Sequence, residues 1–335
     1  MIKARFSKKT FHFKRPSGTS RGVLTEKHAW FIEVWHSHSP EIIGTGECSI
    51  IPGLSPDFID NNTYEAKLKS VCANLEQQLD DWPSIKFGVE TALLDLENGG
   101  VSHIFNNDFI NNQKKIPING LIWMGDKKFM QQQIEDILAN GFSTIKMKIG
   151  AIDFNTEFEL LKAIRRNYSS KEITLRVDAN GAFSPDEALE KLKQLSELDI
   201  HSIEQPIQAG QWKEMHDLCR TSPVDIALDE ELIGVNTTKE KIELLSSIQP
   251  QYIIIKPSLH GGISGSREWI SLAEKHTILW WITSALESNI GLNAICQFTA
   301  EFETDLPQGL GTGSLYVDNI ESKLTVEAGS IFLSK

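Results

Sequence analysis

The feature that most constrains this fold is a run of short apolar strands that alternate with helical stretches from Ile116 onward. The predicted strands lie at residues 116–124, 143–149, 172–178, 199–203, 224–228, 251–256, 277–283 and about 307–310. The predicted helices lie between them, at residues 127–140, 153–167, 184–197, 211–220, 238–247, 263–275 and 289–301. Such repeated βα units predict a parallel sheet, and about eight strands favour an α/β barrel of the (β/α)8 type, here modified to (β/α)7β. The alternative is an open dinucleotide-binding sheet, but no GxGxxG motif opens a helix.

The first hundred residues have a different order of predicted elements, with strands first and helices afterwards. Their elements are predicted at residues 6–13, 29–35 and 42–50 for strands, and about 58–79 and 84–98 for helices. This order predicts a separate α+β region. The stretch from Arg15 to Gly22 is polar and rich in Gly and Ser. It is interpreted either as a plain hairpin loop or as a lid over a site.

Composition excludes several classes of partner. The net charge of −12 leaves no basic surplus to neutralise phosphates, so we expect neither nucleic acid nor a membrane surface as partner. No apolar run reaches the ~18 residues of a membrane span, and the N-terminus lacks the apolar core of a signal peptide. Cys48, Cys72, Cys219 and Cys296 form no CxxC pair, which favours a reducing cytoplasm. An oligomer is compatible with the sequence.

Charged residues lie at the carboxyl ends of five successive predicted strands, which is where the active sites of such barrels lie. They are Lys148, Asp178, Glu204, Asp229 and Lys256, at intervals of 30, 26, 25 and 27 residues. Each interval is one βα unit, so the five side chains should converge at the barrel mouth. Singly, Lys146 and Lys148 would indicate a solvated edge strand, and each acid a helix cap. Together in phase they favour a site, because uncompensated buried charge is costly.

Three carboxylates forced together repel one another unless a cation holds them. Asp178, Glu204 and Asp229 offer oxygen ligands without His or Cys, which favours a hard divalent ion, Mg²⁺ or alternatively Mn²⁺. The metal would polarise a substrate carboxylate and stabilise the enediolate that forms when the α-proton is removed. A lysine can act as the base if nearby cations and burial lower its pKa toward neutrality.

The motif set resembles the enolase superfamily. The motifs that carry the resemblance are Lys-x-Lys at 146–148, Arg-x-Asp-x-Asn at 176–180, Glu-Gln-Pro at 204–206, Asp-Glu at 229–230 and Lys-Pro at 256–257. The resemblance covers nearly the whole chain, and the region with Gly44–Glu47 looks like that superfamily's capping domain. It implies a capping domain at 1–100, a barrel at 101–312 and a tail at 313–335 that packs on the capping domain. Lysines on the second and sixth strands place the chain near the muconate-lactonising subgroup.

Within that subgroup, residues 254–262 and 283–292 resemble the o-succinylbenzoate synthase family, hydro-lyases of menaquinone biosynthesis. The resemblance implies Mg²⁺-dependent syn-dehydration of a 2-succinyl-6-hydroxy-cyclohexadiene carboxylate to 2-succinylbenzoate. It implies that Lys148 removes the α-proton and returns it to the departing hydroxyl. Lys256 would be a fixed cation against the ring, and Lys146 would keep Lys148 deprotonated. The metal ligands would be Asp178, Glu204 and Asp229.

Three further residues are candidates for substrate binding. Ser284 and Ser288 are possible donors to a substrate carboxylate, and Arg176 is either structural or a support behind the site. The alternative activity is that of an N-acylamino-acid racemase or dipeptide epimerase, with Lys148 and Lys256 as proton carriers on opposite faces. Dipeptide epimerases resemble one another in an Asp-x-Asp after the last strand, which residues 308–314 lack. A barrel that only binds an acidic metabolite is the non-enzymatic alternative.

Overall fold

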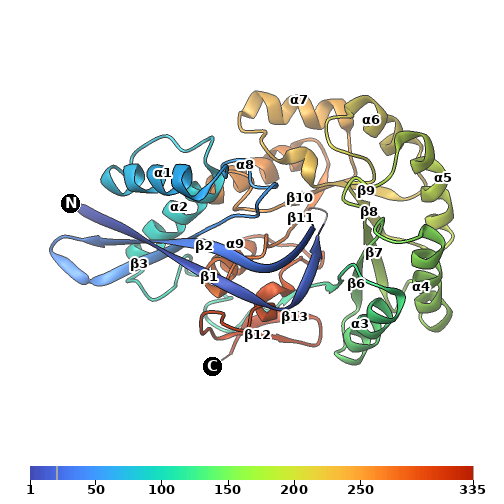
Figure 1. The fold of residues 1–335 in the computed structure, drawn as a ribbon, viewed down its shortest axis with the longest axis horizontal. Helices are drawn as coiled ribbons and strands as arrows, with labels where there is room; N and C mark the ends of the chain where they lie inside the picture. Colours follow the sequence, from blue (N-terminus) through green and yellow to red (C-terminus); the bar gives the residue numbers. More distant parts are fainter. Residues whose placement is uncertain (20–21, 335) are drawn as a thin grey trace.

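A parallel barrel forms the centre of the computed structural model, which describes residues 1–19 and 22–334 (Figure 1). Its strands follow the order β11-β10-β9-β8-β7-β6-β5 in one sheet. They are β5 (Gly120–Ile122), β6 (Thr144–Lys148), β7 (Thr174–Asp178), β8 (Ser202–Glu204), β9 (Asp225–Leu228), β10 (Tyr252–Ile255) and β11 (Leu279–Ile282). Because both faces of a parallel sheet are covered, β10 and β11 are apolar throughout. Strands β6 and β7 instead carry charged residues among their apolar ones.

The segment at Gln308 and Gly309 closes the barrel as its eighth strand. Gly309 bridges in parallel to Thr283 beyond β11, and Gln308 bridges in parallel to Ile118 before β5. The backbone N–H of Gly309 donates to Ile282 O at 2.8 Å, and that of Asn119 donates to Gln308 O at 3.0 Å. The predicted eighth strand is therefore present, and the open-sheet alternative is wrong.

Seven helices connect these strands, and α3 to α7 follow one another around the outside of the barrel (Figure 1). They are α3 (Lys127–Ala139), α4 (Phe154–Asn167), α5 (Pro185–Ser196), α6 (Trp212–Thr221), α7 (Thr238–Ile248), α8 (Gly262–Lys275) and α9 (Asn289–Thr299). Local sequence fixes several starts: Asp126 accepts from Phe129 N, and Ser184 and Thr237 form capping boxes. Each helix lies within a few residues of its predicted position.

The capping domain is an antiparallel sheet with two helices against it. The sheet consists of β1 (Ile2–Thr19), β2 (Gly22–His36) and β3 (Ser39–Ser49), and the helices are α1 (Asn61–Ala73) and α2 (Pro83–Glu97). Gly44 and Gly46 let α2 approach β3 closely, because a Cβ on them would lie 2.1 Å from Ala92 O and 1.9 Å from Gly88 O. This close approach encloses a core that includes Trp30 and Tyr64.

The prediction of a loop at residues 15–22 is wrong for most of these residues. β1 continues to Thr19 and β2 begins at Gly22, so the two strands form one long ribbon. The pairing register shifts between His12 and Ser17, and Pro16, which has no N–H to donate, falls inside this interruption of an edge strand. Residues 20–21 of the proposed lid lie outside the described residues.

The C-terminal segment contacts both parts of the molecule. Tyr316 bridges to Phe13 of β1, whereas β12 (Leu324–Glu327) and β13 (Ser330–Leu333) form a small sheet with β4 (Ile116–Pro117). Two 3₁₀ turns, Glu230–Leu232 and Gly311–Ser314, lie beside the barrel mouth. The domain limits 1–100, 101–312 and 313–335 remain a prediction. Within the described ranges, every helix is too short or too polar to cross a bilayer.

Candidate active site

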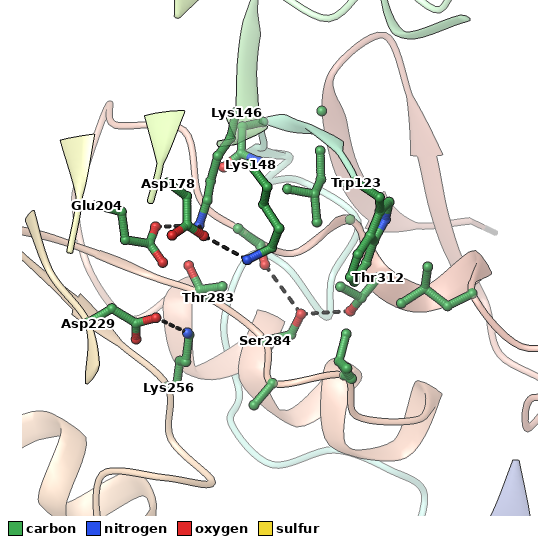
Figure 2. Close-up of a pocket in the computed structure, with 18 of the residues that line it drawn as sticks. Trp123, Lys146, Lys148, Asp178, Glu204, Asp229, Lys256, Thr283, Ser284 and Thr312 are labelled. Atoms are coloured by element: carbon green, nitrogen blue, oxygen red, sulfur yellow. Dashed lines mark hydrogen bonds and ion pairs between the residues drawn. The ribbon is translucent and has the colours of Figure 1, made fainter. Parts of the chain in front are cut away.

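Strand register brings the charged residues of neighbouring strands side by side. Lys148 of β6 stands opposite Asp178 of β7, and Asp178 stands opposite Glu204 of β8. Asp229 and Lys256 directly follow β9 and β10. Because the strands are parallel, these carboxyl ends share one rim of the barrel, and the five side chains point into one pocket (Figure 2).

The pocket is a cavity of about 300 Å³ between the barrel mouth and the capping domain. Its polar side carries the lysines and acids of the strand ends. Its remaining wall is largely apolar, with Ile51 and Leu54 from the capping domain, Trp123 and Leu286 from the barrel, and Leu315 from the C-terminal segment. A cavity with one charged side and one apolar wall suits a small organic acid.

The lysines and acids are joined by ion pairs. Lys146 Nζ contacts Glu204 and lies 3.0 Å from Asp178 Oδ2, while Lys148 Nζ lies 2.9 Å from the same Asp178 oxygen. Lys256 pairs with Asp229. Figure 2 shows Lys148 and Lys256 extending into the pocket from different strands. These contacts compensate charges that would otherwise be buried alone.

The acids respond differently to this environment. Burial raises the pKa of Glu204 to about 8, and the charge of Asp178 adds to the rise while Lys146 opposes it. Burial also raises the pKa of Asp178, but Lys146 and Lys148 outweigh it, so the net pKa lies well below the usual range. Burial lowers the pKa of Lys256, but Asp229 and Glu204 outweigh it, so this ammonium holds its proton firmly.

The donor atoms of the site suit a hard divalent cation. Glu204 Oε1, Asp229 Oδ1 and Glu230 Oε2 are buried and have no hydrogen-bond partner. Such oxygens are costly to bury, and they are the ligands that Mg²⁺ prefers. Lysine ammonium groups pair with the other carboxylate oxygens of Asp178, Glu204 and Asp229. Among the described residues, no three His, Cys, Asp or Glu side chains are already arranged to bind one metal ion. The ligand chemistry therefore fits, and ion binding would require the acids to turn from the lysines.

Two residues that received no role from the sequence join this network. Lys148 Nζ donates to Asn180 Oδ1 at 2.7 Å, and Asn180 Nδ2 donates to Glu230 Oε1 at 3.0 Å. Asn180 has a φ of 46°, a left-handed conformation that Asn tolerates better than most residues. Both residues belong to the motifs named above: Asn180 lies two residues after Asp178, and Glu230 directly follows Asp229. These positions in the motifs are the sequence signal that could identify them.

Gln205 positions the backbone that carries Asp229. Its Oε1 accepts from Asp229 N at 3.2 Å and from Glu231 N at 3.3 Å, and its Nε2 donates to Glu231 Oε2 at 3.1 Å. The side chain is fully buried. The glutamine of the Glu-Gln-Pro motif thus ties the end of β8 to the loop after β9.

The three candidate substrate-binding residues differ in their placement. Ser284 lines the cavity, with its Oγ 2.6 Å from Thr312 Oγ1. Ser288 lies outside the cavity lining and caps α9. Its N–H and its hydroxyl both donate to Glu47, which favours a structural role, and the substrate-donor role stays a prediction. Arg176 is also buried away from the cavity, where it donates to Pro307 O at 2.7 Å and lies 4.2 Å from the Trp281 ring, which favours its structural interpretation.

Comparison with known proteins places the chain in a family. Residues 129–335 match the model described as enolase C-terminal domain-like. An o-succinylbenzoate synthase of Desulfotalea psychrophila is 46% identical, over 96% of this chain and 96% of that protein. The chain belongs to the enolase superfamily. Within it, the chain is an enzyme of the family that includes this synthase, as the sequence motifs predicted.

Solved structures agree with this family and with the predicted capped barrel. The crystal structure of MenC from Desulfotalea psychrophila LSv54 has a TM-score of 0.88 at 42% identity, covering 99% of both chains. The L-Ala-D/L-Glu epimerase of Bacillus subtilis, in a substrate-liganded complex, has a TM-score of 0.84 at 20% identity over 99% of this chain and 96% of its own. This second likeness concerns the fold alone.

Proposed function

We propose that this enzyme is an Mg²⁺-dependent o-succinylbenzoate synthase. It would dehydrate 2-succinyl-6-hydroxy-cyclohexadiene carboxylate to 2-succinylbenzoate by syn elimination, as a hydro-lyase of menaquinone biosynthesis. One observation carries the proposal: the lysine–acid–lysine ring faces a single cavity in a chain 46% identical to an o-succinylbenzoate synthase over 96% of its length. The substrate is a small carboxylate, which the charged side of the cavity suits.

Asp178, Glu204 and Asp229 are proposed to hold the metal, with Glu230 contributing a further buried oxygen nearby. When bound, Mg²⁺ supplies positive charge beside the substrate carboxylate and so lowers the cost of removing the α-proton. Enolase-superfamily enzymes depend on Mg²⁺ for this purpose. Mn²⁺ prefers similar oxygen ligands and is the alternative ion.

Lys148 is proposed as the group that moves the proton. Its Nζ is oriented by Asp178 and Asn180, which place it at the cavity surface. Neutral Lys148 takes the α-proton, and the resulting ammonium donates the same proton to the hydroxyl, which leaves as water. One group thus serves as base and then as acid on one face, as syn elimination requires.

The other two lysines are proposed to act as fixed charges. Lys256 enters the cavity from a different strand and pairs with Asp229, so it faces the ring of the substrate as a permanent cation. Lys146 lies between Asp178 and Glu204, one residue layer below Lys148. The ammonium groups of Lys146 and Lys148 contact the same Asp178 oxygen, so the two positive charges lie close together.

N-acylamino-acid racemisation is the second candidate function. The observation that favours it is the entry of Lys148 and Lys256 into the cavity from separate strands, which would let each lysine serve one face (Figure 2). Dipeptide epimerisation is less well supported. Residues 308–314 carry no acid for a substrate amine, and Gln308 is engaged with Ile282 N at 2.7 Å.

A direct assay distinguishes these functions. Purified protein with Mg²⁺ is offered the cyclohexadiene carboxylate and, separately, N-succinyl amino acids, each with an EDTA control. The expected result is dehydration that EDTA abolishes and added Mg²⁺ restores. Racemisation without dehydration would favour the second candidate, and absence of both activities would contradict the proposal.

A further inference from the structure

A buried lysine of the capping domain contacts the back of the cavity wall. The wall in question is the loop between β11 and α9, of which Thr283, Ser284, Ala285 and Leu286 line the cavity. Lys27 of β2 lies behind this loop and is 3% exposed. Its ammonium donates to Ala285 O at 2.9 Å, to Leu286 O and to Ser49 Oγ. The full donor capacity of the ammonium is thereby used.

The loop needs such support because its backbone is strained. Leu286 has a φ of 63°, a left-handed conformation that is unfavourable for a residue with a branched side chain. Its carbonyl oxygen accepts a second hydrogen bond, from Tyr316 Oη at 2.6 Å. Lys27 and Tyr316 therefore fix the same carbonyl from two different parts of the chain.

The rest of the loop is held by carboxylates. Glu287 accepts from Ala285 N at 2.6 Å and from Ser258 Oγ, and Glu47 of β3 accepts from Ser288 N and Gly291 N, both at 2.9 Å. Burial lowers the pKa of Lys27, and its attraction to Glu287 and Glu47 offsets this only in part. A closed network of buried groups is rigid, and loss of one member leaves its partners unsatisfied.

We propose that Lys27 is a positioning residue of the active site, which acts from the capping domain by holding the 285–286 carbonyls and so the wall that carries Ser284. The proposal deepens the function given above and rests on it for its kinetic readout. In the proposed function, the wall lines the cavity that holds the substrate and supplies no group that moves a proton. A loosened wall should therefore weaken ground state and transition state alike, which raises KM and leaves kcat nearly unchanged.

The test compares Lys27→Met with a matched inter-domain control. Met has similar length but no donor, so the two carbonyls lose Lys27. The control is Glu90→Gln: Glu90 of α2 accepts from Ile263 N at 2.6 Å and from Ser264 Oγ, and thus links the capping domain to α8 rather than to the wall. For Lys27→Met we expect KM to rise on the order of tenfold with kcat within about twofold. For Glu90→Gln we expect a lower Tm and an unchanged KM.

Hydrogen exchange gives a readout that does not depend on turnover. Amides in residues 283–290 should exchange about tenfold faster in Lys27→Met and at the wild-type rate in Glu90→Gln. If Lys27→Met lowers Tm as Glu90→Gln does, with KM and wall exchange unchanged, Lys27 only stabilises the fold and the inference is wrong. If wild-type protein fails to dehydrate its substrate, the proposed function fails, and the exchange comparison still decides the role of Lys27.

If Lys27→Met does not fold, Tyr316→Phe provides a second test of the inference. It removes only the second donor to Leu286 O, so its effects on KM and wall exchange should be in the same direction but smaller. Unchanged values in Tyr316→Phe would then contradict the inference. Where both single variants fold, the double variant should raise KM by more than the product of the two single effects, because each donor partly compensates for loss of the other.

Discussion

Lys148 is the side chain on which the proposed chemistry depends most directly. Lys148→Ala removes the group that carries the proton but leaves the acids in place. We expect dehydration to fall by at least about 10²–10⁴-fold, the usual contribution of a general base. Mg²⁺ should still raise Tm in this variant, because Asp178, Glu204 and Asp229 remain. Steady-state kinetics and thermal scans with and without Mg²⁺ test both parts, and near-normal turnover would show that another group is the base.

Glu204 tests the proposed metal site. Glu204→Gln keeps the shape of the side chain and removes one negative charge and one carboxylate oxygen. Mg²⁺ affinity, measured by titration calorimetry, should fall on the order of tenfold or more. Glu197→Gln, a change at an exposed glutamate after α5, serves as control and should bind Mg²⁺ as the wild type does. Equal affinities in all three proteins would exclude Glu204 as a ligand.

The raised pKa of Glu204 also predicts a pH dependence of stability in the metal-free protein. The folded pKa is about 8, and the ordinary value is 4.5. Between these values the folded state binds a proton that the unfolded state has released. This group's contribution to the free energy of unfolding therefore decreases as pH rises from about 4.5 to 8. Denaturation in EDTA should show this decrease, and Glu204→Gln should lack it. Saturating Mg²⁺ should also reduce it, because a cation favours the charged form.

Ser288 and Lys27 show which individual roles the sequence could and could not supply. The ring from Lys148 to Lys256 was predictable because one residue recurs per βα unit, and strand register converts that period into proximity. Ser288 has the same kind of position after a strand, but its hydroxyl is used by Glu47, 241 residues earlier. Lys27 meets Leu286 across 259 residues. Such pairings depend on how the two domains dock, and no local pattern encodes that.

At the level of strands and helices, alternation in the sequence predicted the barrel units because each buries apolar residues at its own period. The errors fall where pairing with another strand, rather than local composition, decides the structure. The predicted strand 116–124 is two strands, since β4 pairs with β13 and β5 joins the barrel. The region 15–22 has loop composition, yet β1 and β2 continue through most of it because they pair with each other.

The contact between β3 and α2 gives a test at this level. Gly46→Ala would place a Cβ 1.9 Å from Gly88 O and 2.6 Å from Thr91 Oγ1, so the helix must move away from the sheet. We expect a loss of stability at the upper end of the about 1–3 kcal/mol typical of overpacking. Gly53→Ala is the control, since its Cβ meets no atom within 4 Å and only its φ of 77° opposes the change. Denaturant titration of both variants would contradict the steric argument if the two losses were equal.

At the level of the whole molecule, the capping domain and the barrel share both a core and polar contacts. One apolar cluster contains Phe11 and Phe31 of the capping sheet together with Leu259 and Leu286 of the barrel loops. Glu47 and Glu90 of the capping domain bond to the first N–H groups of α9 and α8. The cavity lies at this junction, so its shape depends on both domains being docked.

This shared interface predicts that the two domains unfold together. Far-UV circular dichroism and the fluorescence of the buried tryptophans, of which Trp30 lies in the capping core and Trp269 in the barrel core, should give coincident denaturant transitions. Glu47→Gln removes a negative charge at the start of α9 that also attracts Lys27. We expect the free energy of unfolding to fall by about 1–3 kcal/mol, and the denaturation midpoint to fall with it. If cooperative unfolding arises from the whole interface, the transitions followed by circular dichroism and by fluorescence will still coincide in this variant. Separate transitions in the wild type would mean that each domain is stable alone, and the cavity would then be held only by the docking of two independent parts.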